Sequence, residues 1–342
     1  MRAVVLVGGE GTRLRPLTER TPKPAVTLVD RPFLAYMIEW LAGHGVEEVV
    51  LACGFLPDRL REVLGEGEPG GPRLRYAVEP EPLGTAGAIR FAAEQAWGEG
   101  AAGNGEPFLA LNGDCLSDLD LSALMACHER AGAIATLGLY PVADPAAFGL
   151  VLRDPAGAVT EFLEKPEPGS PEAERAGTVA EPEINAGIYV LEPEVLGRIS
   201  AGRKVSIERE VFPGLVGEGL QGMRLEGYWQ DIGTPERYLA ATWDILEGRV
   251  RTAVEPRPGG VLIDPSAEVA GAPEGIGPRA VIGPECEVGA GATITGSVLH
   301  RGCRVGAGAT VLDSILAPGA RVAPGAEIGG QVIGPEQEVP AV

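Results

Sequence analysis

Residues 1–13 read MRAVVLVGGEGTR, in which an apolar run from Ala3 to Val7 is followed at once by a glycine-rich turn. An apolar run of this length is typical of a buried strand, so we expect a strand from Arg2 to Val7. Small residues in the turn leave backbone N–H groups open to phosphate oxygens. The turn matches neither the Walker pattern GxxxxGK[ST] nor the dinucleotide pattern GxGxxG. The stretch therefore predicts a strand that runs into a phosphate-sized loop of another class.

Strand-like and helix-like segments alternate after this loop. The helical patterns are Phe33 to Gly43 and Gly84 to Trp97, and the strand patterns are Glu48 to Cys53, Leu74 to Val78 and Phe108 to Leu111. Such alternation predicts an α/β fold with a mostly parallel sheet. The last of these strands ends in Asn112-Gly113-Asp114, which places a carboxylate where ligands of open α/β sheets bind.

After about residue 250 the helical pattern disappears and apolar residues recur in steps of six, six and five. The series is Ile282, Val288, Ile294, Leu299, Val305, Val311, Leu316, Val322, Ile328, Ile333 and Val339. Hexapeptide periodicity of this kind indicates a parallel β-helix, whose triangular coils place one aliphatic side chain inward on each side. The alternative is a disordered Gly/Pro-rich tail, which would not keep aliphatic residues in register. We therefore expect two domains, residues 1–250 and 251–342.

Charge and composition exclude several functional classes. A formal net charge of −20 disfavours nucleic acid or an anionic membrane as a partner, because both need a basic surface. No stretch approaches the roughly 20 apolar residues of a membrane span, so we expect a cytoplasmic protein without a membrane partner. The five cysteines form no CxxC pair, and the three histidines lie far apart. We expect reduced thiols and partly exposed histidines that bind no metal.

Lysine is nearly absent from the chain. Lys and Arg total 28, and only three of these residues are lysines. A lysine in such a chain suggests a place where a compact ammonium group fits and a planar guanidinium does not. Lys23 and Lys165 lie inside motifs, whereas Lys204 is interpreted as a solvated surface charge.

The string GGEGTRLRPLTERTPKP, from Gly8 to Pro24, resembles the N-terminal signature of the sugar-1-phosphate nucleotidyltransferases. Five further strings follow in the order of this family, and with it they cover residues 1 to about 245. They are EPEPLGTAGAI (Glu79 to Ile89), LNGD (Leu111 to Asp114), FLEKP (Phe162 to Pro166), NAGIYVL (Asn185 to Leu191) and YWQDIGTP (Tyr228 to Pro235). Within the family, the chain most resembles the long-form mannose-1-phosphate guanylyltransferases. That resemblance implies a Rossmann-like catalytic domain followed by a left-handed parallel β-helix.

The resemblance also implies catalytic and metal-binding residues. Arg13 and Lys23 would supply positive charge to the leaving pyrophosphate, and Lys165 would contact the phosphate of the sugar. Asp114 and Asp231 would hold Mg²⁺, a hard cation that prefers a few carboxylates together with phosphate oxygens and water.

Substrate-binding positions are implied in the same way. For the nucleotide they are Gly8, Gly9, Gly11, Thr12, Glu79, Gly84 and Thr85, and for the sugar phosphate they are Gly149, Glu164, Lys165 and Asn185. Asn185 offers both a donor and an acceptor to sugar hydroxyls. Glu10 places a carboxylate inside the phosphate loop, so we expect its side chain to face away from the phosphates.

The choice of base depends on Glu79. An ionised carboxylate only accepts hydrogen bonds, and guanine presents N1–H and N2–H₂ donors side by side, so Glu79 favours guanine unless it faces solvent or pairs with an arginine. The expected reaction is GTP + α-D-mannose 1-phosphate ⇌ GDP-mannose + pyrophosphate. We expect a homo-oligomer, and a β-helix that assembles subunits or packs on the catalytic domain without performing the chemistry. Two alternatives stay open, a glucose-1-phosphate thymidylyl- or uridylyltransferase and a non-catalytic subunit that senses nucleotide sugars. The presence of all the charged motif residues together disfavours the second alternative.

Overall fold

The computed structural model describes residues 1–98, 105–145, 148–165, 169–170, 177, 179–271 and 275–341. Pro166 of the FLEKP string lies outside these residues. The chain forms two compact units, and both are discontinuous in sequence. The first unit consists of Met1–Gly8 and Met37–Trp229, and the second consists of Gly9–Tyr36 and Gln230–Val342. The glycine-rich loop is thus divided between the units, and the expected domain boundary near residue 250 stays a prediction.

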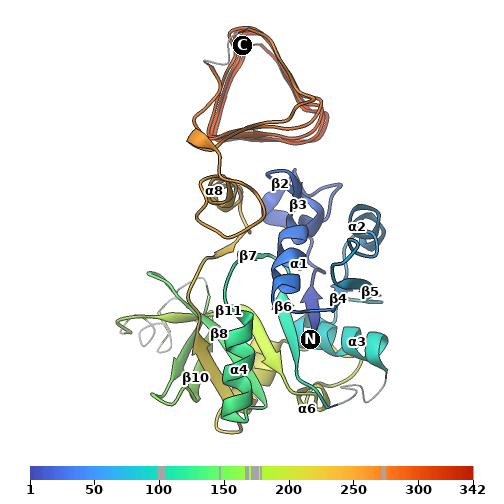
Figure 1. The fold of residues 1–342 in the computed structure, drawn as a ribbon, viewed down its shortest axis with the longest axis vertical. Coiled ribbons are helices and arrows are strands. Elements are labelled where there is room, and N and C mark those ends of the chain that lie inside the picture. Colours follow the sequence, from blue (N-terminus) through green and yellow to red (C-terminus); the bar gives the residue numbers. More distant parts are fainter. Residues whose placement is uncertain are drawn as a thin grey trace. The chain divides into compact units, whose positions relative to one another are not determined.

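A parallel layer of four strands forms one half of the sheet in the first unit (Figure 1). In spatial order these strands are β6 (Phe108–Asn112), β1 (Arg2–Leu6), β4 (Glu48–Cys53) and β5 (Arg73–Val78), and each neighbouring pair is parallel. Their apolar side chains are buried on both faces of the sheet, as in other parallel sheets with covered faces. The strands predicted from the sequence are confirmed, and helices α1 (Phe33–Gly43) and α3 (Gly84–Trp97) have the predicted bounds.

The other half of the sheet is mixed, which the sequence pattern did not indicate. The long strand β11 (Glu183–Leu191) runs antiparallel to β6, β8 (Ala135–Pro141) and β9 (Gly149–Arg153). A hairpin joins β9 to β10 (Val159–Glu164), and β12 (Leu220–Arg224) runs parallel to β8. A short turn between consecutive strands requires an antiparallel pair, so the parallel expectation holds only where helices connect the strands.

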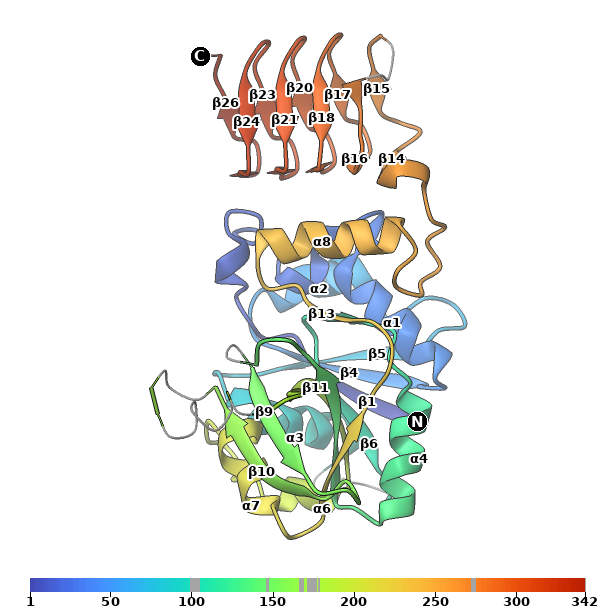
Figure 2. The ribbon, with the colours of Figure 1, turned by 90° about the vertical axis from the view of Figure 1, so that its left-hand side faces the viewer.

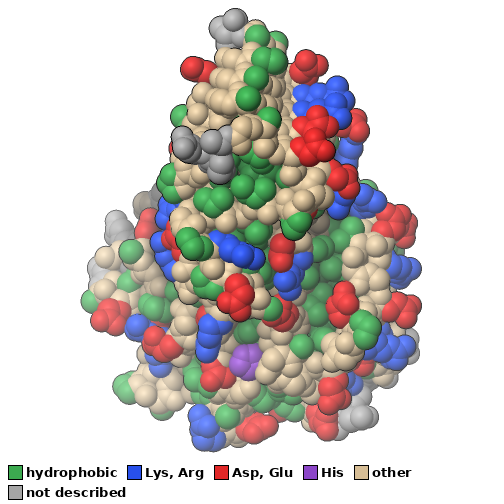
Figure 3. Space-filling view, turned by 45° about the horizontal axis from the view of Figure 1, so that its top comes forward, with side chains coloured by type: hydrophobic (Ala, Val, Ile, Leu, Met, Phe, Trp, Pro, Cys, Tyr) green, Lys and Arg blue, Asp and Glu red, His purple; other side chains and the backbone are tan. Residues whose placement is uncertain are grey.

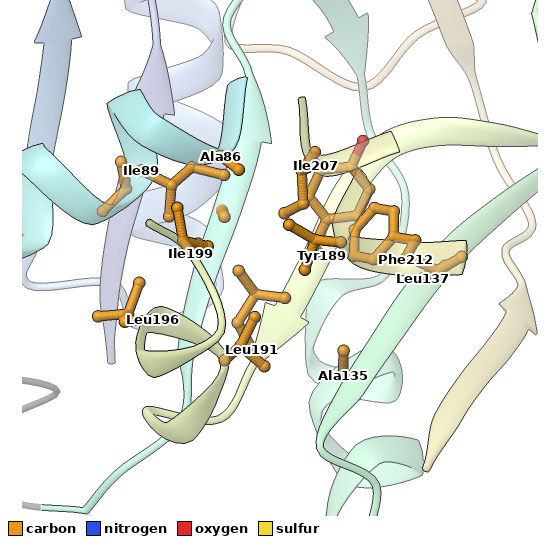
Figure 4. Packing of buried hydrophobic residues seen from close by; sticks show 14 of the residues in the cluster. Ala86, Ile89, Ala135, Leu137, Tyr189, Leu191, Leu196, Ile199, Ile207 and Phe212 are labelled. Carbon is orange, nitrogen blue, oxygen red and sulfur yellow. The ribbon is translucent and has the colours of Figure 1, made fainter. Parts of the chain in front are cut away.

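The core of the first unit lies where α3 packs on this sheet. Figure 4 shows Ala86 and Ile89 of α3 near Ile199, with Tyr189 and Phe212 packed against each other farther along the cluster. The shorter elements of the unit are α2 (Pro57–Leu64), β7 (Cys115–Ser117), α4 (Leu121–Ala131), α6 (Glu194–Gly197), the π-helical turn η3 (Ile207–Val211) and α7 (Phe212–Leu215). Strand β13 (Trp229–Asp231) crosses into the second unit.

The second unit contains the segment Gly9–Tyr36, helix α8 and a β-helix. The segment contains the 3₁₀ turns η1 (Thr12–Leu14) and η2 (Lys23–Ala25) and the hairpin of β2 (Thr27–Leu28) and β3 (Arg31–Pro32). Helix α8 (Pro235–Leu246) begins at the side-chain cap Thr234, and the turn η4 (Pro258–Gly260) leads to the β-helix.

Three parallel sheets form the sides of the β-helix. One consists of β14 (Val261–Ile263), β16 (Ala280–Ile282), β19 (Ser297–Leu299), β22 (Ile315–Leu316) and β25 (Val332–Ile333). The second consists of β15 (Glu268–Val269), β17 (Glu287–Val288), β20 (Arg304–Val305), β23 (Arg321–Val322) and β26 (Glu338–Val339), and the third of β18 (Thr293–Thr295), β21 (Thr310–Leu312) and β24 (Glu327–Gly329). The coils are triangular when viewed along their axis (Figure 1) and stack side by side in the turned view (Figure 2).

The register of the coils confirms the 17-residue unit. Ile282 pairs with Leu299, Leu299 with Leu316, and Leu316 with Ile333, and these side chains belong to one buried cluster. The structure also has an earlier coil, in which Ile263 pairs with Ile282. That coil is two residues longer than the repeat, so its aliphatic residues did not fit the period of the sequence.

Two histidines correct the expectation of partial exposure. His128 and His300 are 1% and 5% exposed, because each lies among packed elements with a hydrogen-bonding side chain beside its ring. The cysteines are free thiols, as expected. Acidic and basic side chains are interspersed over the face in Figure 3. No helix in the described parts of the chain is long and apolar enough to cross a membrane.

Candidate functional site

Two of the predicted nucleotide-binding residues meet at the carboxyl edge of the parallel strands. Gly8 follows β1, Gly54 follows β4 and Glu79 follows β5. A Cβ atom at Gly8 would lie 3.3 Å from both Glu79 Oε1 and Gly54 N, and one at Gly54 would lie 2.8 Å from Gly8 O. The approach at Gly54 therefore requires a residue without a side chain, whereas a side chain at Gly8 would need its neighbours to shift by a few tenths of an ångström.

Asp114 lies at the same edge, in the turn that follows β6. The backbone N–H of Gly113 donates to Leu6 O at 2.9 Å, and a Cβ atom at Gly113 would lie 2.6 Å from that oxygen. Glycine is therefore required for the turn to dock on the end of β1, and this docking fixes the position of Asp114. The placement predicted from the sequence is confirmed, while the role of the carboxylate as a metal ligand stays a prediction.

Glu79 does not point into solvent, but one of its oxygens is already used. Oε2 accepts from Leu83 N at 2.9 Å, next to the first residue of α3, and Oε1 faces Gly8. Burial raises the pKa of Glu79, and the Leu83 N–H offsets part of that shift. A bidentate contact with guanine would compete with the bond to Leu83, so Oε1 is the oxygen available to a base.

Gly84 and Thr85 begin α3 against the segment that contains η3. Gly84 has φ +71°, and a Cβ atom there would lie 2.6 Å from Val205 O, so the position requires glycine. Thr85 Oγ1 donates to Glu208 Oε2 at 2.7 Å and accepts from Ile207 N at 2.8 Å. The hydroxyl of Thr85 is thus engaged within the protein, and the N–H groups of Ala86 and Gly87 donate to Val205 O, so a phosphate contact at Thr85 stays a prediction. Sequence reasoning missed the buried Glu208, because the mixed polar and apolar sequence from Val205 to Val211 does not mark this glutamate as buried.

Three predicted sugar-phosphate residues lie together at the β9–β10 hairpin. Gly149 and Glu164 are register partners, and a Cβ atom at Gly149 would overlap the Glu164 carboxylate. Lys165 Nζ lies 3.4 Å from Glu164 Oε1, and the Lys165 side chain is 59% exposed. Burial raises the pKa of Glu164, and the charge of Lys165 lowers it in part. Lys165 itself has φ +44°, a strained conformation of the kind that collects at functional sites.

Asn185 differs from the expectation of a free sugar-binding amide. Its Nδ2 donates to Tyr189 Oη at 2.9 Å and its Oδ1 accepts from Gly187 N at 3.0 Å. These bonds span the irregularity of β11 between Asn185 and Tyr189. The amide therefore holds the bulge, and only its second N–H and second lone pair remain for a ligand.

An aromatic group beside the hairpin was also missed. The Trp229 ring lies 5.6 Å from the rings of both Tyr140 and Phe148, and Trp229 Nε1 donates to Ala186 O at 2.9 Å. Phe148 immediately precedes Gly149, and Trp229 belongs to the YWQDIGTP string. The position of Phe148 beside the predicted Gly149, and of Trp229 within a motif, was the available signal.

In the second unit, the remainder of the glycine-rich loop folds onto itself. Gly11 has φ +62°, and its carbonyl accepts from Thr18 Oγ1 at 2.8 Å. A Cβ atom at Gly11 would lie 3.1 Å from Lys23 Cβ, whereas one at Gly9 would meet nothing within 4 Å. Glu10 is exposed and pairs with Arg15 at 3.0 Å, so its charge is directed to solvent as expected.

Cationic side chains surround Asp231 in this unit. Lys23 Nζ lies 3.9 Å from Asp231 Oδ1, and Arg237 Nη1 lies 2.5 Å from Oδ2. A Cβ atom at Gly233 would lie 2.5 Å from Arg13 Nη2 and 2.9 Å from Asp231 Oδ1, so Arg13 belongs to the same group. Arg237 was missed, since nothing in its local sequence marks it as a partner of Asp231. Arg13 and Thr12 both lie in η1.

The Asp231 carboxylate is incompletely satisfied. Its Oδ1 is buried and has no hydrogen-bond partner among the described residues. A buried oxygen in this state is uncommon and fits a hard cation or its water ligands. Over the described ranges, no three or more His, Cys, Asp or Glu side chains are grouped into a metal-binding cluster.

Comparisons with known proteins cover nearly the whole chain. Residues 2–248 match the family model described as nucleotidyl transferase, and residues 258–340 match the model described as GMPPB C-terminal domain. The chain is 38% identical over 304 residues to a mannose-1-phosphate guanylyltransferase of Mycobacterium tuberculosis, over 88% of this chain and 80% of the relative. It is 37% identical to the probable mannose-1-phosphate guanylyltransferase 2 of Arabidopsis thaliana, over 88% of this chain and 82% of the relative.

A solved structure, HddC from Yersinia pseudotuberculosis, is similar with a TM-score of 0.57 and 27% identity, over 70% of this chain and 97% of that one. The same protein complexed with GMP-PN also gives a TM-score of 0.57, at 26% identity and the same coverage.

Proposed function

The chain belongs to the nucleotidyl transferase family, and from this premise we propose that it catalyses GTP + α-D-mannose 1-phosphate ⇌ GDP-mannose + pyrophosphate. An oxygen of the sugar phosphate attacks the α-phosphorus of GTP, and the bond from that phosphorus to the β-phosphate oxygen breaks. The names of the relatives support the choice of mannose and guanine. The structural observation that supports phosphoryl-type chemistry best is the buried Lys23 beside Asp231, whose Oδ1 has no hydrogen-bond partner among the described residues.

Positive charge on the leaving pyrophosphate would come from Arg13 and Lys23. Reactions of this type need little covalent chemistry from the protein, so positioning and charge neutralisation supply most of the catalysis. The Lys23 side chain is 10% exposed, so its ammonium is held in place before the substrate arrives. Backbone N–H groups of the loop would contact the phosphates, at Gly8, Gly9, Gly11 and Thr12.

Asp114 and Asp231 are proposed as ligands of Mg²⁺. The bound ion would neutralise charge on the phosphate oxygens. Two observations support this proposal: Asp231 Oδ1 has no hydrogen-bond partner among the described residues, and Asp114 follows β6 at the carboxyl edge of the sheet.

The sugar phosphate would bind at the β9–β10 hairpin. Glu164 would accept hydrogen bonds from sugar hydroxyls beside the bare backbone of Gly149, and Lys165 would turn its exposed ammonium toward the phosphate. Asn185 would contribute only the donor and acceptor that its bonds to Tyr189 and Gly187 leave open.

A pyrophosphate-release assay over GTP, dTTP and UTP, each with mannose 1-phosphate and glucose 1-phosphate, tests this function. We expect the highest kcat/KM for GTP with mannose 1-phosphate. A preference for dTTP or UTP with glucose 1-phosphate would support the thymidylyl- or uridylyltransferase. Absence of release in all six pairs, from protein shown to be folded, would support the non-catalytic subunit.

We also propose that the chain forms a homo-oligomer through its β-helix. Strand β26 pairs with β23 and with no other described strand, so one edge of β26 is unpaired among the described residues, a feature that favours association. Light scattering coupled to size exclusion would measure the assembly. A monomer at micromolar concentration would refute the proposal.

A further inference from the structure

One buried hydroxyl in the second unit joins three segments that lie far apart in the sequence. Tyr238, in α8, is 2% exposed, and its Oη donates to Thr27 O at 2.6 Å. On its other side, His300 Nε2 lies 3.3 Å from the same oxygen, with ring centroids 6.2 Å apart. His300 directly follows β19 of the β-helix. The hydroxyl therefore connects the segment Gly9–Tyr36 to the β-helix.

The direction of these hydrogen bonds follows from the donors available. The only hydroxyl hydrogen of Tyr238 is used by the carbonyl of Thr27, so the His300 ring has to donate through Nε2–H. Burial lowers the pKa of His300 to about 4, which keeps the ring neutral at ordinary pH. A neutral imidazole protonated on Nε2 satisfies both bonds.

Thr27 is rigidly connected to the catalytic lysine of the loop. Lys23 begins the turn η2, and the turn is closed by Ala25 N donating to Pro22 O at 2.8 Å and Val26 N donating to Lys23 O at 3.1 Å. Thr27 is the next residue. Because the turn leaves little freedom between them, fixing the carbonyl of Thr27 fixes the start of the Lys23 side chain.

The same turn of α8 also holds the acidic partner of Lys23. Arg237, next to Tyr238, pairs with Asp231 Oδ2, and the helix starts from the cap at Thr234. The first turn of α8 therefore positions Lys23 through Tyr238 and Asp231 through Arg237.

A second contact between the segment and the β-helix is weaker. Arg20 and Glu336 are 3.8 Å apart, and both side chains are more than 70% exposed. Exposed pairs of this kind contribute little to stability. A Cβ atom at Gly334 would lie 3.3 Å from Pro16 Cβ, which indicates packing without a hydrogen bond. Among the described contacts, the Tyr238 hydroxyl is thus the buried polar link.

We propose that Tyr238 is a positioning residue for the Lys23–Asp231 pair, and that His300 extends this positioning to the β-helix. The β-helix is then part of the scaffold of the pyrophosphate-binding charges, in addition to any role in assembly. The consequence for turnover rests on the proposed function, whereas the consequence for the mobility of the segment Gly9–Tyr36 does not.

Tyr238→Phe tests the first half of the proposal, because it removes the hydroxyl and keeps the ring. Losing one net hydrogen bond should speed amide hydrogen exchange in residues 9–36 by about five- to tenfold. Displacement of Lys23 should lower kcat/KM for GTP by about tenfold while the KM for mannose 1-phosphate stays unchanged. The matched control is Tyr76→Phe, which removes a hydroxyl that donates to Gly65 O in the first unit. It should change neither quantity.

His300 variants test the second half. His300→Leu removes the donor and should reproduce the faster exchange in residues 9–36, whereas His300→Gln keeps an N–H donor and should restore most of the protection. Wild-type exchange in Tyr238→Phe, or an equal rise of both KM values, would overturn the proposal. If wild-type protein releases no pyrophosphate from any substrate pair, the proposed function fails, and the exchange measurements still decide whether Tyr238 and His300 fix the segment.

Discussion

Two of the three lysines occupy opposite surroundings. Lys23 is buried in the second unit, on a hydrogen-bonded turn and within 3.9 Å of Asp231. Lys165 is 59% exposed at the end of a strand in the first unit, beside Glu164. The same ammonium group is thus immobilised in one place and left adjustable in the other. A charged group that is immobilised before the substrate binds stabilises the charge of the transition state more strongly. We therefore expect substitutions of buried charged residues to lower activity more than substitutions of exposed ones.

The largest effect is expected from Asp231→Asn, in the buried group. The substitution keeps the shape of the side chain and removes the charge that faces Lys23 and Arg237. We expect kcat to fall by about a hundred- to thousandfold, as for loss of a preorganised electrostatic contact. Pyrophosphate release at several Mg²⁺ concentrations measures the loss, and circular dichroism verifies the fold. Near-normal Mg²⁺-dependent turnover would remove Asp231 from the proposed ligands.

Lys23→Arg should have the next largest effect. The charge is kept, but a planar guanidinium has to occupy a space shaped for an ammonium group between Gly11 and Asp231. A displacement of about 1 Å is enough to lower turnover by about a hundredfold. Lys204→Arg, at an exposed position, is the matched control. If both variants lost the same small amount of activity, burial would not distinguish Lys23.

Glu79→Gln is expected to have an intermediate effect, because Glu79 is half-buried and already bonded to Leu83. Loss of one charge-assisted acceptor at Oε1 should lower kcat/KM for GTP by about tenfold and that for dTTP much less. The discriminating quantity is the GTP-to-dTTP ratio in wild type and variant. An unchanged ratio would exclude Glu79 as the residue that selects the base.

Lys165→Arg should have the smallest effect. An exposed side chain can readjust, so the KM for mannose 1-phosphate should rise by about three- to tenfold, with kcat and the KM for GTP nearly unchanged. A larger loss than in Lys23→Arg would reverse the ranking by burial. Equal changes in both KM values would argue against a contact between Lys165 and the sugar phosphate.

The β-helix could be predicted residue by residue because its partners are set by a local repeat. Ile282 pairs with Leu299, 17 residues later, and Leu299 pairs with Leu316 at the same spacing. The parallel strands and α3 were equally readable, since burial on both faces and helical periodicity are local patterns. The coil that contains Ile263 was not predicted, because it is two residues longer than the repeat.

The missed parts of the site depend on contacts between distant segments. Thr85 meets Glu208 across 123 positions, and Tyr238 meets Thr27 across 211. Asn185 stays a predicted ligand, but the bonds of its amide within the bulge of β11 could not be predicted, because they depend on the pairing of that strand. Motifs indicated candidate site residues, while tertiary packing decided which of their atoms remain available.

The hydrogen bonds that join Tyr238 to Thr27 and His300 limit how chains of this family could recombine. One family model ends at residue 248 and the next begins at residue 258. Recombination between them would take Thr27 and Tyr238 from one parent and His300 from the other. A hybrid made at that boundary would inherit its glycine-rich segment from one parent and the coils that support it from the other. Such a hybrid would retain these hydrogen bonds only if both parents had matching residues at the three positions. For this chain, the compact unit that contains all three residues is the discontinuous pair Gly9–Tyr36 and Gln230–Val342.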